Sequence, residues 1–354
     1  MLAYVLDNRS LRIKDILEFE KYEFIEDIEY AEKSSITVTK KPDILDDDFV
    51  ICKDGNNKVF TGICDTYKSG SNNSEYSITL LQKENLFDRK IFVDQEELIA
   101  NTGIEDFIAK AIEDNFISSG DELMDKGYIT VSVESHTPIA AKVDAENGVY
   151  NLKTYLGNAK QYYGIQLEYE FSGIQLQIRI FKQDDAVIPI DIEVTDVSDY
   201  SETYSVSVLA KLDVNWKIPD QEDISGEVIV GDSSRRQFFL LADRTITEDI
   251  ADENRAAGIA SSKYIEAETE EEMLQNVYNE FSSNQYSHKV SFYLKRDSNL
   301  YPEARFFVGR KCMIKTKSGV RTSIVTKSEI KESSALRRLT FGKLKITLIE
   351  RLRG

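Results

Sequence analysis

The sequence predicts a mixed α+β, β-rich protein with two similar antiparallel β-modules, each carrying an inserted α+β unit. Three observations lead to this fold class. Short runs of β-branched and aromatic residues, separated by polar turns, fill both ends of the chain. Two segments of helical periodicity and one helix-capping motif interrupt these runs. The length of 354 residues also exceeds the size at which a single hydrophobic core keeps growing, so we expect several domains.

Strand signals define the first β-module. Its short runs are rich in Val, Ile, Thr, Phe and Tyr, and turns such as residues 54–57 and 69–73 separate them. This pattern is typical of antiparallel strands joined by hairpins. We place these strands at residues 34–40, 48–53, 57–67 and 75–82.

The first insert begins where the apolar period changes to that of a helix. From residue 102 the apolar residues fall on one face of a helix of about four turns. A strand is predicted at 128–135, and a second helical pattern stops at Gly164, a residue type that commonly ends helices. Alternating strands at 165–171 and 174–180 complete a small α+β unit.

The second half of the chain repeats this alternation. Thr269 and Glu272 form a capping box that opens a helix with Met273, Val277 and Phe281 on its apolar face. Further strands are predicted at residues 188–195, 203–210, 227–230, 237–241, 286–294, 304–316, 319–331 and 337–349. The expected domains are a first β-module at 1–88, an α+β insert at 89–185, a second β-module from 186–212 and 300–354, and a second insert at 213–299.

Two hairpins in the chain resemble each other. Residues 49–64 and 311–325 share the order of an apolar strand, a turn and a second strand with a central Thr. A polar turn and a closing strand follow each hairpin, at 76–81 and 339–346. Two copies of one β-module would explain this similarity, but unrelated antiparallel hairpins could also produce it.

Charge divides the chain into two opposite regions. The formal net charge is −18, yet residues 289–354 carry 17 Lys and Arg against 5 Asp and Glu. The remaining residues carry 27 basic against 57 acidic side chains. Such polarity favours head-to-tail contact with another copy or a neighbouring subunit, although a solvated basic strand face is the alternative. The acidic excess of residues 1–288 argues against a nucleic-acid-binding function, because such binding requires Lys and Arg side chains that neutralise phosphates.

Cysteine usage and hydropathy define the setting of the chain. Cys52, Cys64 and Cys312 lie in apolar runs without a metal-ligand spacing, so we expect buried free thiols. No apolar run reaches membrane-spanning length, and the N-terminus lacks a signal segment. We therefore expect synthesis in the cytoplasm and no membrane segment.

The sequence shows no catalytic motif. The two histidines, His136 and His288, lie outside any zinc, hydrolase or phosphate-loop pattern, and we interpret them as structural. We expect no catalytic residue, cofactor or metal site.

Two carboxylate pairs stay open to an acid/base interpretation. Asp191 and Glu193 are predicted to share one strand face, as are Glu168 and Glu170. Paired carboxylates are the catalytic groups of glycosidases, but the polar outer face of a half-buried strand gives the same pattern.

The order of elements in the C-terminal third suggests a family. The relevant segments are the strand and acidic turn at 238–247, the helix at 269–282, the strand at 283–292, the Gly-containing strand at 307–314 and the hairpin strand at 320–330. This third resembles the N-terminal module of siphophage and prophage tail hub proteins, the tail-associated lysins. Over nearly the whole chain, the element order resembles the phage baseplate hub.

The resemblance implies a mechanical role at the virion tail tip. Hub proteins of this family have two β-barrel tube modules per chain and assemble as homotrimers. Their pseudo-sixfold ring adapts the sixfold tail tube to a threefold tip and forms a channel for DNA passage. Adjoining tail proteins, such as the distal tail ring and tail fibre or tip components, would be partners. Synthesis would take place in the cytoplasm of the bacterial host.

The hub interpretation assigns roles to particular charged residues. An acidic channel lining would repel DNA phosphates, and the candidate residues are Asp46, Asp47, Asp48, Glu26 and Asp27. An ordinary solvated face is the alternative for each of them. Arg337 and Arg338 are candidates for the subunit interface, and reversal of their charge is expected to impair assembly before folding.

Two other functions remain as alternatives. In the family that the chain resembles, longer members carry a cell-wall hydrolase domain after the hub module, so hydrolysis by a carboxylate pair is one alternative. The chain ends directly after the last predicted strand, so we expect no such domain. A carbohydrate- or receptor-binding tail protein is the other alternative, but Trp216 and the scattered tyrosines form no stacking ladder.

Overall fold

The computed structural model describes two compact units. It covers residues 1–70, 74–92, 103–137, 149–184, 186–203, 209–222, 228–241, 245–285, 289–316, 319–332 and 334–342. The described residues of 1–139, 143–200 and 291–340 form unit 1, and those of 201–290 with 341–342 form unit 2. The chain is rich in strands and has few helices, as predicted.

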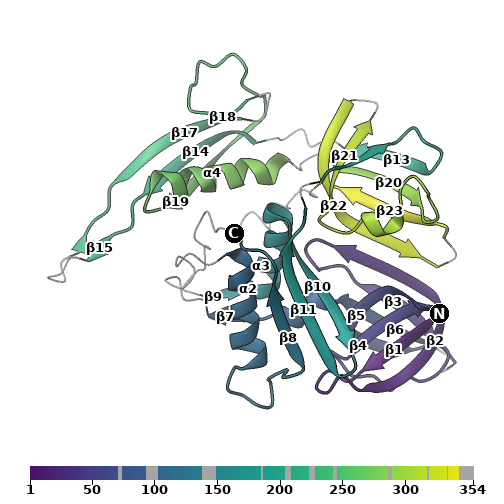
Figure 1. Ribbon diagram of the computed structural model, residues 1–354. Coiled ribbons are helices and arrows are strands. Elements are labelled where there is room, and N and C mark those ends of the chain that lie inside the picture. The colour runs from purple at the N-terminus through teal and green to yellow at the C-terminus, as the bar shows by residue number, and fades with distance from the viewer. Residues whose placement is uncertain are drawn as a thin grey trace. The chain divides into compact units, whose positions relative to one another are not determined.

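Six N-terminal strands of unit 1 pair in a closed circuit. They are β1 (Leu2–Leu6), β2 (Ile13–Asp27), β3 (Ser34–Val38), β4 (Phe49–Asp54), β5 (Asn57–Ser69) and β6 (Tyr76–Gln82). Their order is β1-β4-β5-β6-β3-β2, and β1 also pairs with β2, so the pairings return to their start (Figure 1). Inward side chains such as Val5, Phe19 and Ile36 form a buried core between them.

The second strand set has the same order. It contains β12 (Ile188–Asp191), β13 (Val197–Thr203), β20 (Lys289–Lys295), β21 (Lys311–Thr316), β22 (Gly319–Lys331) and β23 (Leu336–Phe341). The strands pair in the order β12-β21-β22-β23-β20-β13. This is the order of the first set if the six strands of each set are numbered along the chain, so that β12 corresponds to β1 and β23 to β6. The similar hairpins of the sequence, β4–β5 and β21–β22, therefore occupy equivalent places. One difference is that β12 pairs with β21 in parallel, whereas β1 and β4 are antiparallel.

A single ladder joins the two sets into one twelve-stranded sheet. The last part of β2 pairs with the last part of β22, from Glu23 opposite Lys331 to Asp27 opposite Lys327. Two strands of these sets differ from the sequence-based prediction. The strand predicted from residue 304 begins only at Lys311, because the short 3₁₀ helix Glu303–Arg305 and Gly309, at φ 95°, precede it. The long β2 was not predicted. Its pairing is irregular between Ile13 and Asp15 and between Phe19 and Lys21.

The helices and strands of the expected insert lie within unit 1. Helix α2 (Ile104–Ile112) continues as a π turn over 113–117, and α3 (Leu152–Asn158) continues over 159–163 and ends at Gly164, at φ 73°. Strands β10 (Ile165–Ser172), β11 (Gln175–Lys182) and β8 (Ile129–Val133) form a three-stranded sheet in that order, against which α2 packs. Short strands β7 (Lys90–Phe92) and β9 (Val149–Asn151) pair beside it. Helix α3 approaches the first strand set at Gly157, where an added Cβ would lie 2.9 Å from the Ile28 carbonyl oxygen.

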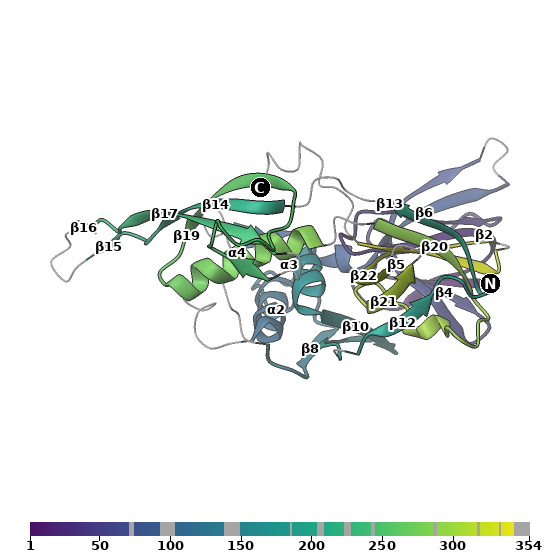
Figure 2. The same ribbon diagram turned by 90° about the horizontal axis from the view of Figure 1, so that it is seen from above.

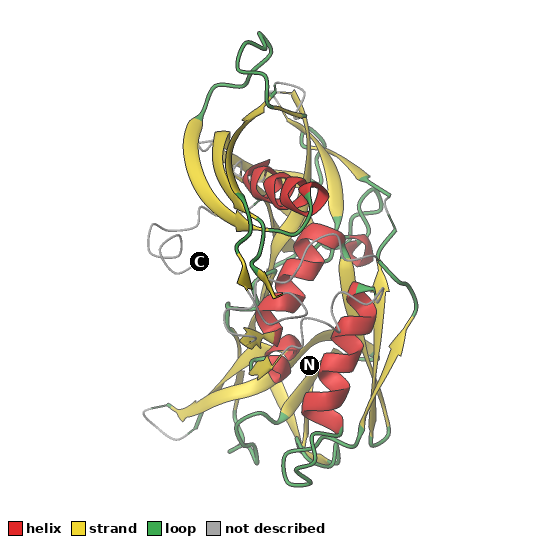
Figure 3. Ribbon diagram, turned by 90° about the vertical axis from the view of Figure 1, so that its left-hand side faces the viewer, coloured by secondary structure: helices red, strands yellow, loops and turns green. Residues whose placement is uncertain are grey.

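Unit 2 is a four-stranded sheet with a helix on one face. The order is β18 (Ile246–Thr247), β17 (Ser233–Leu240), β14 (Leu209–Lys217) and β19 (Ile259–Glu266). Helix α4 (Glu270–Gln285) lies along one side of this curved sheet (Figure 3) and buries Met273, Val277 and Phe281, as predicted. The small hairpin of β15 (Gln221–Glu222) and β16 (Val228–Ile229) extends beyond β14 and β17 (Figure 2).

Two predicted strand positions differ from the structure at the unit 2 boundary. The strand predicted at 203–210 falls on the end of β13 and the start of β14, with residues 204–208 outside the described part. Strand β20 pairs with β23 and β13 in the main sheet, although the expected second insert extends to residue 299.

The cysteine prediction is confirmed. Cys52, Cys64 and Cys312 are free and buried. Burial raises the pKa of the Cys64 and Cys312 thiols to about 12, so these thiols are protonated near neutral pH. Within the described ranges, no helix is both long enough and apolar enough to cross a membrane.

Candidate interaction surfaces

The acidic turn at residues 45–48 is held by the side chain of Asp48. Asp48 is 1% exposed, and its carboxylate accepts hydrogen bonds from Lys14 Nζ at 2.7 Å and from the backbone N–H groups of Asn8 and Leu45. Partial burial alone would lower the pKa of Lys14, but the hydrogen bond and charge of Asp48 outweigh it and raise that pKa. Asp46 and Asp47 are exposed on the same turn.

These contacts predict unequal effects of two neighbouring substitutions. Asp48→Ala should lower the free energy of unfolding by about 2 kcal/mol, because Lys14 and two N–H groups lose their acceptor. Asp46→Ala, the matched control, should change it by less than about 0.5 kcal/mol. Urea unfolding followed by circular dichroism measures both values. Equal losses for the two variants would contradict the structural role of Asp48.

Asp27 also belongs to the hydrogen bonding of the fold. Its buried carboxylate accepts the N–H groups of Glu29 and Glu32 at 2.8 and 2.7 Å, and Gln82 Nε2 donates to it at 2.9 Å. Glu26 is half-buried on β2. Of the five candidate channel acids, the carboxylates of Asp27 and Asp48 are therefore directed into the protein. A channel-lining role for any of the five stays a prediction.

The two candidate interface arginines lie on opposite faces of β23. Arg337 is 7% exposed, and it donates from Nε to Ser328 Oγ at 2.7 Å and from Nη1 to the Glu303 carbonyl oxygen at 3.1 Å. Burial lowers the pKa of its guanidinium, and the charges of Glu26 and Glu303 oppose this effect. Arg338 is exposed and lies over the Tyr293 ring. The alternation of the strand places Arg337 in phase with the buried Leu339. An interface role for either arginine stays a prediction.

The carboxylate pairs form ion pairs with basic side chains. Strand β12 ends at Asp191, so the expectation that Asp191 and Glu193 share one strand face is wrong. Asp191 pairs with Lys315 Nζ at 2.9 Å, and this hydrogen bond lowers the pKa of Asp191. Glu168 pairs with Arg179. A general acid needs a raised pKa, so these contacts do not favour glycosidase chemistry.

His136 lies at the start of the first helix. Its Nδ1 is 2.6 Å from Asp106 Oδ2, and this hydrogen bond raises the pKa of the exposed imidazole. Asp106 also accepts the Gly103 N–H at 3.0 Å, which caps α2. This arrangement is typical of a helix terminus. His288 lies outside the described residues.

A groove lies beside β12 in unit 1, and we call it the β12 groove. Its volume is about 450 Å³, and it lies between the outer face of β12, β21 and β22 and the segment at 300–306. Much of its lining is apolar and exposed, since Leu300 is 63% and Val320 is 59% exposed. The lining residues used below are Pro189, Leu300, Arg305, Met313, Lys315 and Val320. Such exposed apolar surface is typical of an interaction site.

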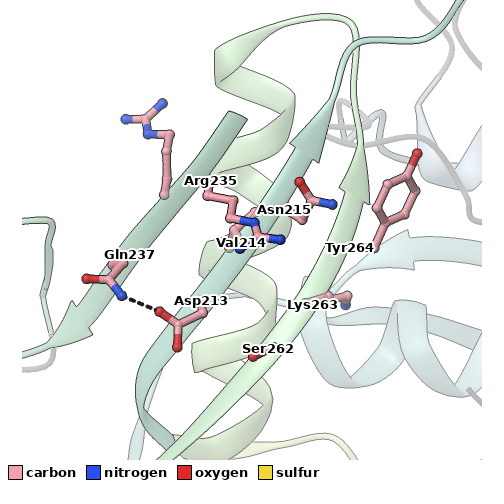
Figure 4. A pocket seen from close by; sticks show the side chains of 9 residues that line it. Asp213, Val214, Asn215, Arg235, Gln237, Ser262, Lys263 and Tyr264 are labelled. Atoms are coloured by element: carbon pink, nitrogen blue, oxygen red, sulfur yellow. Dashed lines mark hydrogen bonds between the residues drawn. The ribbon is translucent and has the colours of Figure 1, made fainter. Parts of the chain in front are cut away.

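Unit 2 has a polar pocket of about 610 Å³ on the sheet face opposite α4 (Figure 4). Asp213 and Asn215 of β14, Arg235 and Gln237 of β17, and Tyr264 of β19 line it. Gln237 Nε2 donates to Asp213 Oδ1 at 2.6 Å. The pocket offers donors and acceptors for a polar ligand. No sequence motif marks this pocket, because its residues come from three strands that pair only in the fold.

Metal binding finds no support in the described residues. No group of three or more His, Cys, Asp and Glu side chains among them lies close enough to hold an ion. Trp216 is also structural, since its Nε1 donates to the Ala267 carbonyl oxygen at 2.9 Å.

The fold of the chain is similar to that of several solved structures. Prophage tail protein gp18 from Listeria monocytogenes superposes with a TM-score of 0.54 at 9% identity, covering 100% of this chain and 98% of its own. The 43 kDa tail protein of prophage MuSo2 from Shewanella oneidensis gives a TM-score of 0.52 at 11% identity, covering 97% and 98% of the two chains. The chain has the fold of prophage tail proteins.

A third tail protein has a similar structure over nearly the whole chain. The tail protein from Neisseria meningitidis superposes with a TM-score of 0.51 at 10% identity, covering 97% of this chain and 95% of its own. Comparison of the sequence with protein-family models and with curated proteins finds no match. The tail-protein fold is therefore shown by structural superposition, at identities of 9% to 11%.

Proposed function

We propose that the chain is a structural protein of a bacteriophage or prophage tail tip, with the role of a baseplate hub. The observation that carries this proposal is the tail-protein fold over essentially the whole chain. The proteins of similar fold are described as tail proteins. By this proposal, the chain is synthesised in the cytoplasm of a bacterial host and works in the virion tail, next to other tail proteins.

The repeated strand order supports an adapter role. Each chain has two strand sets of the same order. The first is β1 to β6, and the second is β12, β13 and β20 to β23. In a homotrimer, three chains supply six similar strand sets. We propose that these sets form β-barrel tube modules in a pseudo-sixfold ring that joins a sixfold tail tube to a threefold tip. A channel for DNA passage would run through the ring. In this proposal β20 belongs to the second module.

The charge polarity supports contacts between unlike surfaces. The acidic residues 1–288 of one copy can face the basic residues 289–354 of the next. A cyclic trimer needs such a heterologous contact, in which one surface meets a different one on its neighbour. No membrane contact enters the proposal.

Solution mass and position on the particle test this function. Light scattering on the purified chain should give a trimer, and added salt should shift it towards monomer because the contacts are partly electrostatic. Gold-labelled antibody should mark the tail tip of purified particles. A label elsewhere on the particle, or its absence from particles, would overturn the tail-tip role.

The hydrolase alternative has a separate test. The ion pairs of Asp191 and Glu168 disfavour an acid/base role, so the purified chain should not clear a suspension of bacterial cell walls. Clearing that is lost in Asp191→Asn would replace the structural proposal with a cell-wall hydrolase.

A further inference from the structure

The acidic turn presents an apolar side chain to solvent. Leu45 is 65% exposed, and the exposed Asp46 and Asp47 follow it directly. The turn has a defined conformation, since Asp48 accepts the Leu45 N–H at 2.8 Å and Asp47 N–H bonds to the Cys64 carbonyl oxygen at 2.9 Å. Leu45, followed by two exposed carboxylates on a turn of fixed backbone, therefore forms a small apolar projection with an acidic edge.

The β12 groove has the complementary composition. Pro189 lies opposite Met313, and Lys315 lies opposite Val320, so these side chains share the outer face of three strands. Pro189, Met313, Val320 and the exposed Leu300 make the apolar floor of the groove. Two basic side chains, Arg305 and Lys315, lie at this floor, and Lys315 also pairs with Asp191, a further lining residue, at 2.9 Å.

The free edge of β12 is closed to an added strand. Asp191 donates its N–H to Tyr301 Oη at 2.9 Å. Pro189 would present its N–H in the same direction, two residues earlier, but proline has none. An occupant of the groove therefore meets side chains instead of extending the sheet.

We propose that the β12 groove of one copy receives Leu45 of a second copy, with Asp46 and Asp47 of the second copy facing Arg305 and Lys315. Because Leu45 is exposed in its own chain, it does not fill its own groove. Charge complementarity between the acidic turn and the basic C-terminal segment selects a second copy as the occupant. This contact rests on the proposed oligomeric function. It gives Asp46 and Asp47 a subunit contact in place of the channel lining expected from the sequence.

Engineered cysteines test the contact directly. A chain that carries both Leu45→Cys and Val320→Cys should form covalent multimers under mild oxidation on a non-reducing gel. Each single variant should stay monomeric on that gel, and a mixture of the two single variants should give a covalent dimer and nothing larger. The native thiols are buried and protonated, so they do not compete. The absence of cross-links in the double variant would overturn the contact, as would equal cross-linking of either single variant with itself.

Charge reversal gives an independent measurement. Asp46→Lys with Asp47→Lys should raise the Kd of self-association by about tenfold or more, and adding Arg305→Glu should recover part of the loss. Glu122→Lys, an exposed acid on another loop, is the matched control and should leave the Kd unchanged. An unchanged Kd in the double-lysine variant, or a wild-type chain that stays monomeric at high concentration, would overturn this contact. Labelling of the tail tip would still support the proposed function in that case.

Discussion

Replacing Glu84 by glutamine is expected to lower the free energy of unfolding by about 3 kcal/mol. Glu84 lies in the 3₁₀ turn Lys83–Phe87 and is 2% exposed. Its Oε1 is 3.3 Å from Lys83 Nζ and 3.9 Å from Lys160 Nζ. Lys160 is itself buried, so the substitution leaves a buried ammonium group without its carboxylate. Urea unfolding of wild type and variant measures the loss.

The same loss should depend on pH in a defined direction. Burial alone would raise the pKa of Glu84, but the charges of Lys83 and Lys160 outweigh it and hold that pKa below its ordinary value of 4.5. A carboxylate with a lowered folded-state pKa stabilises the fold fully above its unfolded-state pKa. That stabilisation is lost as the pH falls through the folded-state pKa. The difference between wild type and Glu84→Gln should therefore shrink as the pH decreases below about 4.5.

A double substitution provides the control for Glu84. Lys160→Met alone should also destabilise, because it removes one of the two cations beside the buried carboxylate. Lys160→Met combined with Glu84→Gln should cost less than the sum of the two single losses, since no unpaired charge stays buried. The ion pair would be contradicted if the losses in unfolding free energy of the two single variants simply added in the double variant. It would also be contradicted if the difference in unfolding free energy between wild type and Glu84→Gln did not change with pH.

Reversing the charge of Arg337 should prevent stable folding, whereas reversing that of Arg338 should not. Arg337→Glu would place a third carboxylate near Glu26 and Glu303 and should cost about 4 kcal/mol or more. Arg337→Ala should still fold with a loss of about 2 to 4 kcal/mol, because Ser328 loses its partner and a cavity forms. Arg338→Glu should change stability by less than about 0.5 kcal/mol. Thermal unfolding by calorimetry measures all three.

The outcome for Arg337 also separates folding from assembly. If Arg337→Ala unfolds at the wild-type temperature while the oligomer dissociates, Arg337 acts at a subunit surface and its buried position is wrong. If Arg338→Glu weakens self-association at unchanged stability, the expected role of Arg338 in the subunit interface is supported. Both readings need the unfolding temperature and the oligomer mass on the same sample.

Local sequence patterns predicted local structure well in this chain. Periodicity and turn residues, which are local properties of the sequence, predicted three features. These are the strands from 34 to 82, the helix that stops at Gly164 and the apolar face of α4. The hairpin similarity left a duplication open, and the equal order of the two strand sets is visible only in the structure. The buried thiols also followed from their apolar surroundings.

The candidate surfaces were harder to predict, because they depend on partners far apart in sequence. Asp48 looked like one member of an acidic run, and only the fold shows that it is buried and pairs with Lys14. The strand alternation could have identified Arg337, which has the same phase as Leu339 and Phe341. The β12 groove joins residues from 188 to 320, and the unit 2 pocket joins three strands, so no local signal marks either of them.

The ladder between β2 and β22 has a consequence for synthesis on the ribosome. Asp27 pairs opposite Lys327, so the end of β2 leaves the ribosome long before its partner strand. At the usual rate of translation, β22 follows roughly 15 to 60 s later. During that interval the end of β2 is an open strand edge, which can pair with other nascent chains. Slowed elongation late in the message should therefore increase aggregation during expression, and a chaperone that covers exposed strands should reduce it.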